Sequence, residues 1–253
     1  TSITFTKSNN LVTKTNEDST SIILGGYYFN GASQNITRFQ AGYEPGYFYG
    51  FKTDGLFQYD GEVLASPTQN GARAGDIRYV DVNKDGVIDA RDKTKIGSPF
   101  PDFTMGWNIG LQFKNFDFSV YTYLSYGNDV FKAFDRNSNY TNKEVTLLNR
   151  WNGPLSTKDA KNPRFSFLDP NSNNRVSDRY VEDGSFVKIK NIQLGYTLSP
   201  SLFKTKVIKS LRVYVQVKNA FTFTKYSGFD PEISGGILDS GVDRGAYPQA
   251  RTY

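Results

Sequence analysis

Cysteine and histidine are both missing from this chain of 253 residues, and there is only one methionine. Without Cys there can be no disulfide, thiol nucleophile or zinc–thiolate site. Without His, the side chain that most often acts as a general base near neutral pH is missing, so Ser-His-Asp and Cys-His catalysis are impossible within the chain. These absences exclude the commonest catalytic chemistries and predict that the protein is not an enzyme.

Long apolar runs are missing as well, because no stretch approaches the roughly 20 apolar residues that a transmembrane helix needs. The 30 Lys and Arg and the 25 Asp and Glu are dispersed, which predicts no nucleic-acid partner. The first residues, TSITFTKSNN, lack the basic and apolar parts of a signal peptide, so we expect a removed signal or a chain that begins within a longer protein. What remains is a soluble protein or a membrane protein built from strands.

Aromatic residues are abundant at 15% of the chain, a bias that favours strands. Apolar and polar residues alternate strictly through 104–113 and 116–126, and only Lys114 and Asn115 separate the two runs, which predicts a hairpin. Residues 210–223 alternate in the same way. Residues 185–198 alternate with a one-residue change of phase at Lys190–Asn191, as a β-bulge would produce. Weaker strand candidates are 1–6, 21–29 and 249–253.

The connections between these runs are unequal in length. Short ones lie at Lys114–Asn115 and around 199–209, whereas long ones rich in Gly, Pro, Asn and Asp span 30–103, 127–185 and 224–248. Outer-membrane barrels have short periplasmic turns, long extracellular loops and strands of roughly 9–11 residues. The predicted fold is therefore all-β: an antiparallel transmembrane β-barrel segment with the three long connections as extracellular loops.

A secreted or soluble β-sandwich would show the same alternation and stays an alternative. Two features favour the barrel: the polar faces mix Gln, Asn, Lys and Arg with Tyr and Gly, and aromatic residues gather near strand ends, as in interfacial girdles. The residues of these expected girdles are Trp107, Phe113, Phe116, Tyr126, Tyr196, Phe221 and Phe223.

The sharpest local motif is DVNKDGVIDARD, residues 81–92. Its oxygen ligands have the spacing of a calcium loop of the EF-hand type, with Gly86 at the sharp turn and Ile88 as the apolar residue that attaches the loop to its support. The predicted ligands are Asp81, Asn83, Asp85, the Val87 carbonyl, Asp89 and Asp92. Asp92 stands where such loops have Glu, and its shorter arm could admit Mg²⁺ in place of Ca²⁺. The alternative is an Asx-rich turn without metal.

Five segments resemble the C-terminal region of SusC/RagA-type TonB-dependent transporters. They are GYFYGFKTDGLFQ (46–58), GDIRYVDVNKDGVIDARDKTKIGSPFPDFTMGWN (75–108), SDRYVEDGSFVKIKNIQLGYTL (177–198), LRVYVQVKNAFTFTKYSGFDPE (211–232) and GAYPQARTY (245–253). The resemblance runs in order through residues 36–253. It implies a barrel of about 22 strands whose N-terminal plug domain is absent from this chain. It also implies that the three long connections, with the calcium-type loop, face the outside of the cell.

The resemblance further implies a function: TonB-dependent import of oligosaccharides or oligopeptides across the bacterial outer membrane. The expected partners are a SusD-like surface lipoprotein, TonB through the absent N-terminal part, and outer-membrane lipid. A secreted, calcium-stabilised β-sandwich that binds carbohydrate is the alternative function. The carboxylates Asp178, Glu182 and Asp183 could in principle form a glycosidase pair, but no spacing selects them. Loop aromatics could stack on sugars or pack within the loops: Tyr47, Phe48, Tyr49, Tyr140 and Trp151.

Overall fold

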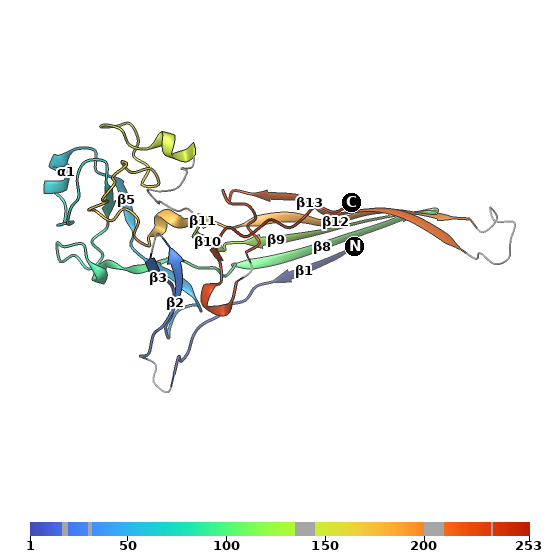
Figure 1. The fold of residues 1–253 in the computed structure, drawn as a ribbon. Helices are drawn as coiled ribbons and strands as arrows, with labels where there is room; N and C mark the ends of the chain where they lie inside the picture. Colours follow the sequence, from blue (N-terminus) through green and yellow to red (C-terminus); the bar gives the residue numbers. More distant parts are fainter. Residues whose placement is uncertain (17–19, 30–31, 135–144, 200–209, 234) are drawn as a thin grey trace.

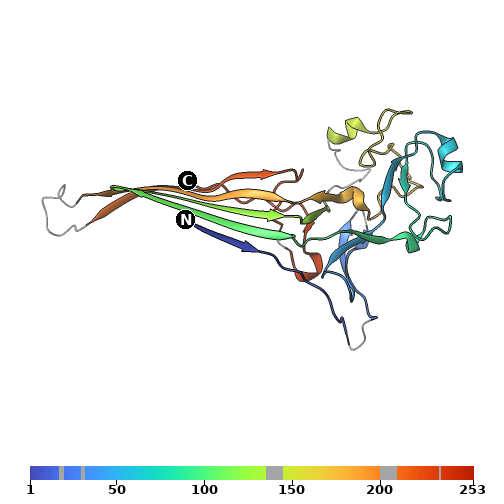
Figure 2. The same ribbon diagram turned by 180° about the vertical axis from the view of Figure 1, so that it is seen from behind.

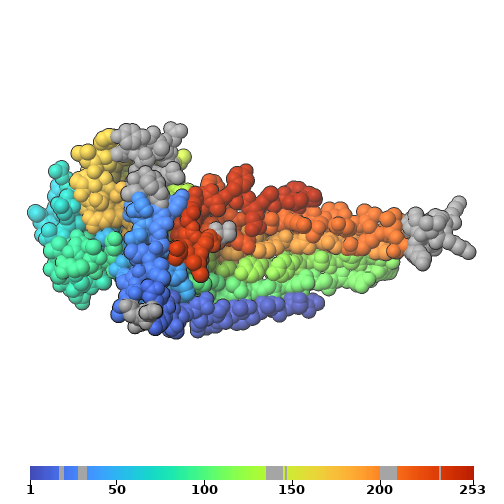
Figure 3. All heavy atoms as spheres, turned by 60° about the horizontal axis from the view of Figure 1, so that its bottom comes forward, coloured from blue at the N-terminus to red at the C-terminus, as the bar shows by residue number. Residues whose placement is uncertain are grey.

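The computed structural model describes the chain except for residues 17–19, 30–31, 135–144, 200–209 and 234. Two regions are evident in Figures 1 and 2: a long, narrow sheet and a broader set of short elements at one end of it. Figure 3 shows the same contrast in space-filling form. We refer to them as the long sheet and the loop region.

The long sheet has five strands in the order β1-β8-β9-β12-β13, and every neighbouring pair is antiparallel. Its strands are β1 (Ser2–Thr6), β8 (Phe103–Phe113), β9 (Phe116–Tyr126), β12 (Phe186–Leu198) and β13 (Leu211–Thr224). The predicted all-β, antiparallel character is therefore confirmed for this sheet. The sheet is open at β1 and β13, so closure into a barrel stays a prediction.

The hairpin predicted at 104–126 is present, with Lys114 at a φ of 51° in its two-residue turn. The predicted bulge is present as well, because the pairing of β12 with both neighbours shifts between Ile189 and Asn191. This extra residue keeps the apolar side chains before and after it on one face of the sheet.

The two faces of the long sheet differ in chemistry. On one face, apolar side chains lie directly opposite one another across four strands, in rows such as Ile109, Val120, Ile192 and Val217, or Leu111, Phe118, Leu194 and Val215. The other face carries rows such as Asn108, Tyr121, Asn191 and Lys218. Among the described residues no second sheet covers the apolar face, and Leu111 and Val215 are 60% and 68% exposed. The sandwich alternative required such a cover, so the structure does not support it.

The loop region is more structured than the sequence predicted, because its long connections carry strands and helical turns of their own. A four-stranded sheet contains β2 (Ile23–Phe29), β3 (Ala32–Phe39), β4 (Tyr47–Gly50) and β7 (Thr94–Gly97). Two smaller sheets contain β5 (Thr53–Leu56) with β6 (Ile77–Tyr79), and β11 (Val181–Asp183) with β10 (Asp129–Lys132) and β14 (Val242–Asp243). The helical elements are α1 (Asp60–Leu64), η1 (Ala90–Asp92), η2 (Val145–Asn149), η3 (Asp178–Tyr180) and η5 (Ile237–Asp239).

Two apolar clusters hold the loop region together. One contains Ile36, Phe48 and Phe131, and the other contains Phe51, Ile77 and Ile88. Most buried hydrophobic side chains belong to this region rather than to the long sheet, so the folded core lies among the loops. Within the described residues, no helix has the length and apolarity to cross a membrane.

The expected strand at 249–253 is reduced to one antiparallel bridge, in which Thr252 exchanges two backbone hydrogen bonds with Lys218 of β13. The expected turn around 199–209 falls almost wholly outside the described residues.

Candidate functional site

The calcium-type loop, residues 81–92, is attached to the loop region by its backbone and by one apolar side chain. Thr68 donates its N–H to the Gly86 carbonyl at 2.8 Å and accepts the Ile88 N–H at 2.9 Å. Ile88 is buried in the cluster that contains Ile77 and Tyr79. The predicted attachment through Ile88 is confirmed.

The first half of the loop has the expected turn geometry. Asp81 accepts the N–H groups of Lys84 and Gly86 at 2.7 and 2.8 Å. Asn83 and Asp85 accept the N–H groups two residues further on, and the Asn83 amide donates to the Asp85 carboxylate at 3.0 Å. Gly86 has a φ of 83°, which is the left-handed conformation that the sharp turn requires.

In the second half of the loop, the carboxylates of Asp89 and Asp92 bind Arg91 and backbone N–H groups. Asp92 is fully buried and accepts the N–H groups of Val82 and Asp89 at 2.9 and 2.8 Å, so it ties the two ends of the loop together. The partly exposed Asp89 pairs with Arg91, whose hydrogen bonds hold the pKa of that carboxyl below its usual value. Arg91 also reaches Asp85 at 2.7 Å.

Of the predicted ligand set, only Asn83 and Asp85 are in direct side-chain contact, while Asp81 accepts backbone N–H groups of the same turn. Asp85 and Asp89 pair with Arg91, and Asp92 accepts backbone N–H groups. As they stand, no three carboxylates among the described residues form a group that could hold a metal ion. The types of donor in the loop suit a hard cation, but the full set needs Asp85 and Asp89 to leave Arg91. Sequence reasoning missed the role of Arg91, although this cation lies within the motif itself.

The segment 225–249 follows β13 and is attached to the polar face of the long sheet by an ion-pair cluster. Lys188 of β12, which is 1% exposed, lies 3.1 Å from Asp230 and 2.9 Å from Glu232. Lys190 reaches Glu232 at 2.6 Å and lies over the Tyr123 ring. Farther along, the segment contacts β2 and β3 through η5, and Thr37 donates to the Leu238 carbonyl at 2.5 Å. The segment thus connects the β13 side of the long sheet to the β2–β3 hairpin.

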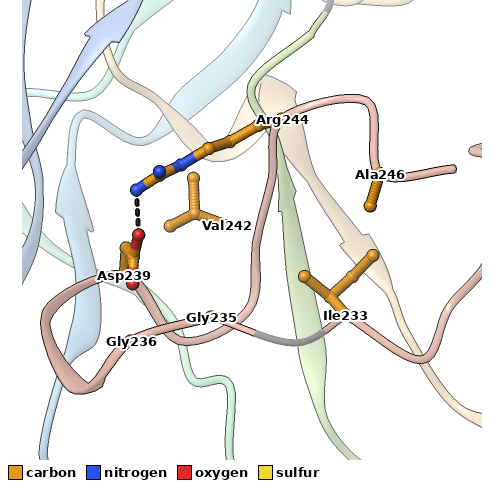
Figure 4. A pocket seen from close by; sticks show the side chains of 7 residues that line it. All are labelled: Ile233, Gly235, Gly236, Asp239, Val242, Arg244 and Ala246. Atoms are coloured by element: carbon orange, nitrogen blue, oxygen red, sulfur yellow. Dashed lines mark hydrogen bonds and ion pairs between the residues drawn. The ribbon is translucent and has the colours of Figure 1, made fainter.

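Within this segment lies a cavity of about 400 Å³. Figure 4 shows Arg244 reaching across it toward Asp239, with which it forms an ion pair, while Val242 lies beside them. The remaining lining residues are Ile233, Gly235, Gly236 and Ala246. The Arg244 guanidinium also lies 4.3 Å from the centre of the Tyr27 ring. The cavity is lined by backbone, one ion pair and a few apolar side chains. This mixture indicates no particular class of ligand.

A buried polar network joins segments about 90 residues apart in the loop region. Asp76 is fully buried and accepts hydrogen bonds from Arg164 at 2.8 and 3.0 Å and from Asn173 at 2.9 Å. Asn171, also fully buried, donates to the Ile77 carbonyl and to Asn173. Because these groups satisfy one another, the network holds the 57–80 and 150–178 segments in one arrangement.

Two positively charged side chains make cation–π contacts with the ring of Phe51, beside this network. The Arg175 guanidinium lies 5.1 Å from the centre of the Phe51 ring and 4.9 Å from that of Tyr79. The Lys93 ammonium lies 5.5 Å from the centre of the Phe51 ring. Burial lowers the pKa of Lys93, and the charge of Arg175 lowers it further.

The other side chains singled out from the sequence are structural. Asp178 accepts the N–H and hydroxyl of Thr53, Glu182 accepts Ser227 and Lys161, and Asp183 accepts the Ser185 N–H. Tyr47 and Phe48 are buried and Trp151 packs against an apolar cluster, so packing rather than sugar stacking accounts for them. Tyr49 is partly buried under the Arg38 guanidinium, and Tyr140 lies outside the described residues.

Known proteins resemble this chain in sequence. TonB-dependent receptor P3 of Formosa agariphila is 32% identical over 218 residues, which are 82% of this chain and 21% of the relative. TonB-dependent receptor SusC of Bacteroides thetaiotaomicron is 31% identical over 225 residues, which are 88% of this chain and 20% of the relative. The chain thus spans about a fifth of the length of the curated relatives it matches. No family model matches it.

Solved structures share the fold of this chain. The RagAB peptide transporter superposes with a TM-score of 0.65 over 90% of this chain and 23% of that chain, at 24% identity. The RagAB peptide importer in its open-open state gives a TM-score of 0.64 over 98% of this chain and 25% of that chain, at 23% identity.

These relatives, together with the long antiparallel sheet, define the class as TonB-dependent receptors. Within that class the chain belongs to the SusC/RagA type, as its sequence motifs indicated, and it corresponds to a segment of such a protein. The named relatives are receptors and transporters rather than enzymes.

Proposed function

We propose that the protein containing this chain is an outer-membrane importer of oligomeric nutrients, a glycan or an oligopeptide, driven through TonB. The observation that carries the proposal is the chemistry of the long sheet: one uncovered apolar face and one polar face, with the folded loops gathered at one end. A lipid-facing barrel wall has this alternation, and loops on one side are typical of its extracellular end. In this proposal the sheet is part of a closed barrel of about 22 strands.

The loop region is proposed to form the extracellular rim on which a SusD-like surface lipoprotein docks. The two apolar clusters and the Asp76 network give the rim one shape, and a preorganised surface loses less conformational freedom on docking. The residues 30–103, 127–185 and 224–248 would face outward, and the chain would supply wall and rim rather than chemistry.

Deletion of the full-length protein tests the import proposal. Loss of growth on one oligomeric glycan or peptide, with normal growth on its monomers, is the expected result. Gentle solubilisation of the full-length protein should also recover a surface lipoprotein. Normal growth of the deletion strain on every oligomer tested, together with recovery of the transporter alone, would refute the proposal.

We also propose that the loop 81–92 binds one structural Ca²⁺ through Asp81, Asn83, Asp85, the Val87 carbonyl, Asp89 and Asp92. The Asx turns of Asp81 and Asp85 support this, because they already curl the first half of the loop. Calcium should raise the thermal unfolding midpoint of the full-length protein more than Mg²⁺ at equal concentration. Asp81→Asn should abolish the effect, while Asp54→Asn, an exposed carboxylate outside the loop, should retain it. An equal calcium response in both variants would contradict the site.

A further inference from the structure

The polar face of the long sheet has a hollow of about 220 Å³ where β1, β8 and β9 lie side by side. Gly106 of β8 lies at its centre, directly opposite Thr4 of β1 and Tyr123 of β9. A Cβ atom at Gly106 would lie 3.4 Å from the Tyr121 hydroxyl oxygen and 4.0 Å from the Thr4 Cβ, so the missing side chain leaves the hollow open. The remaining lining residues are Ser2, Thr6, Thr104 and Asn108.

The lining of the hollow is polar but carries no charge. All of its side chains end in a hydroxyl or amide group, and none of these groups hydrogen bonds to another protein group within the described part of the chain. The strands β1 and β8 contain no charged residue at all. Lys190 lies over the Tyr123 ring, but its charge is paired with Glu232. Farther along the same face, Asp117 and Arg212 pair with each other.

This lining suits a neutral ligand that is rich in hydroxyl groups. The side-chain hydroxyls both donate and accept hydrogen bonds, and so do the hydroxyl groups of a sugar ring. A charged ligand would lose water here without meeting a counter-charge. Peptides are recognised through pockets for their side chains, and the hollow has no purely apolar lining side chain. Tyr121, which is 38% exposed, adds an aromatic ring against which the C–H groups of a sugar can pack.

We propose that the hollow binds one ring of an uncharged saccharide on the inner wall of the importer. The inference rests on the proposed function, in which the polar face lines the inside of the barrel, and it names a neutral glycan rather than an oligopeptide as the nutrient. Thr4 and Tyr121 hydrogen bond to the sugar from the two sides of β8, and Gly106 lets the ring approach the backbone. A site built from hydrogen-bonding groups rejects ligands that leave those groups unpaired.

Isothermal titration of the full-length protein, purified in a detergent without a sugar headgroup, tests the site. The probes are neutral oligosaccharides of glucose, galactose, mannose and xylose, the acidic oligogalacturonate, and an oligoalanine with blocked ends. At least one neutral oligosaccharide should bind, whereas oligogalacturonate and oligoalanine should not. Absence of binding by every neutral oligosaccharide overturns the proposal, and so does equally tight binding of oligogalacturonate or oligoalanine.

Substitutions locate the binding in the hollow. Gly106→Val should abolish saccharide binding, because its side chain fills the hollow while a β-branched residue suits a strand. Thr4→Val removes one hydroxyl at nearly constant shape and should weaken binding about fivefold. The matched control is Thr122→Val, the same change on the apolar face opposite Trp107, and it should bind as the parent protein does. Thermal unfolding verifies that each variant is folded, and an equal loss in Thr4→Val and Thr122→Val overturns the site.

Growth of the deletion strain distinguishes failure of this site from failure of the import proposal. Loss of growth on an oligomer, combined with no saccharide binding by the purified protein, leaves import standing and overturns the site. Saccharide binding that Gly106→Val abolishes, combined with normal growth of the deletion strain on every oligomer, supports the site and contradicts import.

Discussion

At the scale of single residues, Asp92 holds the calcium-type loop together when no ion is bound. It is fully buried and accepts N–H groups from both ends of the loop. Asp92→Asn places an amide donor against one of these N–H groups and removes the charge, so we expect about 2 kcal/mol of destabilisation. Hydrogen exchange of residues 81–92 in calcium-free buffer should quicken accordingly.

The control is Asp89→Asn, because Asp89 is partly exposed and pairs with the more exposed Arg91. Exposed pairs contribute little, and exchange should change less than twofold. Equal effects of the two substitutions would show that Asp92 does not organise the loop.

Lys188 of β12 has the corresponding role for the 225–249 segment, which it binds through Asp230 and Glu232. Lys188→Met removes the cation but leaves Asp230 and Glu232 near the same buried spot. Breaking a buried pair in this way costs about 3–5 kcal/mol, so the segment should detach from the sheet. Protease sensitivity and hydrogen exchange of residues 226–249 measure the change. Lys190→Met is the matched control, since Lys190 is more exposed and contacts only one carboxylate, and its effect should be small.

The same cluster predicts a pH dependence. Burial raises the pKa of Glu232, but the hydrogen bonds and charges of Lys190 and Lys188 outweigh burial and hold it below the ordinary 4.5. A lowered pKa in the folded state means that the stabilisation is present above pH 4.5 and is lost as the pH falls through the lowered value. Exchange of the segment should therefore accelerate only below pH 4.5, and an acceleration between pH 6 and 8 would contradict the assignment.

At the scale of elements, the hairpin of β8 and β9 tests which face meets lipid. Ile109 and Val120 are directly opposite on the apolar face, and Asn108 and Tyr121 are directly opposite on the polar face. Spin labels on the first pair in the full-length protein should be accessible to oxygen and shielded from a water-soluble nickel complex. Labels on the second pair should show the reverse, and equal accessibility of both pairs would refute a lipid-facing hairpin.

The elements also differ in how far the sequence could predict them. Strands of 11–14 residues, such as β8 and β13, give several periods of alternation, so they and the β12 bulge were predicted. Strands of two to four residues, such as β6 and β14, give at most two periods and were read as loop. The ligand spacing of residues 81–92 was visible, but the pairing of Asp89 with Arg91 and of Lys188 with Asp230 depends on three-dimensional placement.

At the scale of the whole molecule, the uncovered apolar face predicts how the protein behaves in solution. Its side chains include Trp107, Leu111, Phe113, Val213 and Phe223, all of which are exposed. A contiguous exposed apolar face across four strands is not typical of soluble monomers. We expect the full-length protein to stay monodisperse in detergent or lipid nanodiscs and to aggregate within minutes of detergent removal, as light scattering would record. A stable, monodisperse protein in plain buffer would contradict the lipid-facing assignment.

The bulge between Ile189 and Asn191 makes β12 more tolerant of substitution than of a change in length. Without the extra residue, every side chain from Asn191 onward would exchange faces, so that Ile192 and Leu194 would point toward the polar side. A single substitution at Lys190 alters only its contacts with Glu232 and Tyr123, whereas deletion of Lys190 misplaces the rest of the strand. Variation at this place in related proteins should therefore consist of exchanged residues, while insertions and deletions accumulate in the loops.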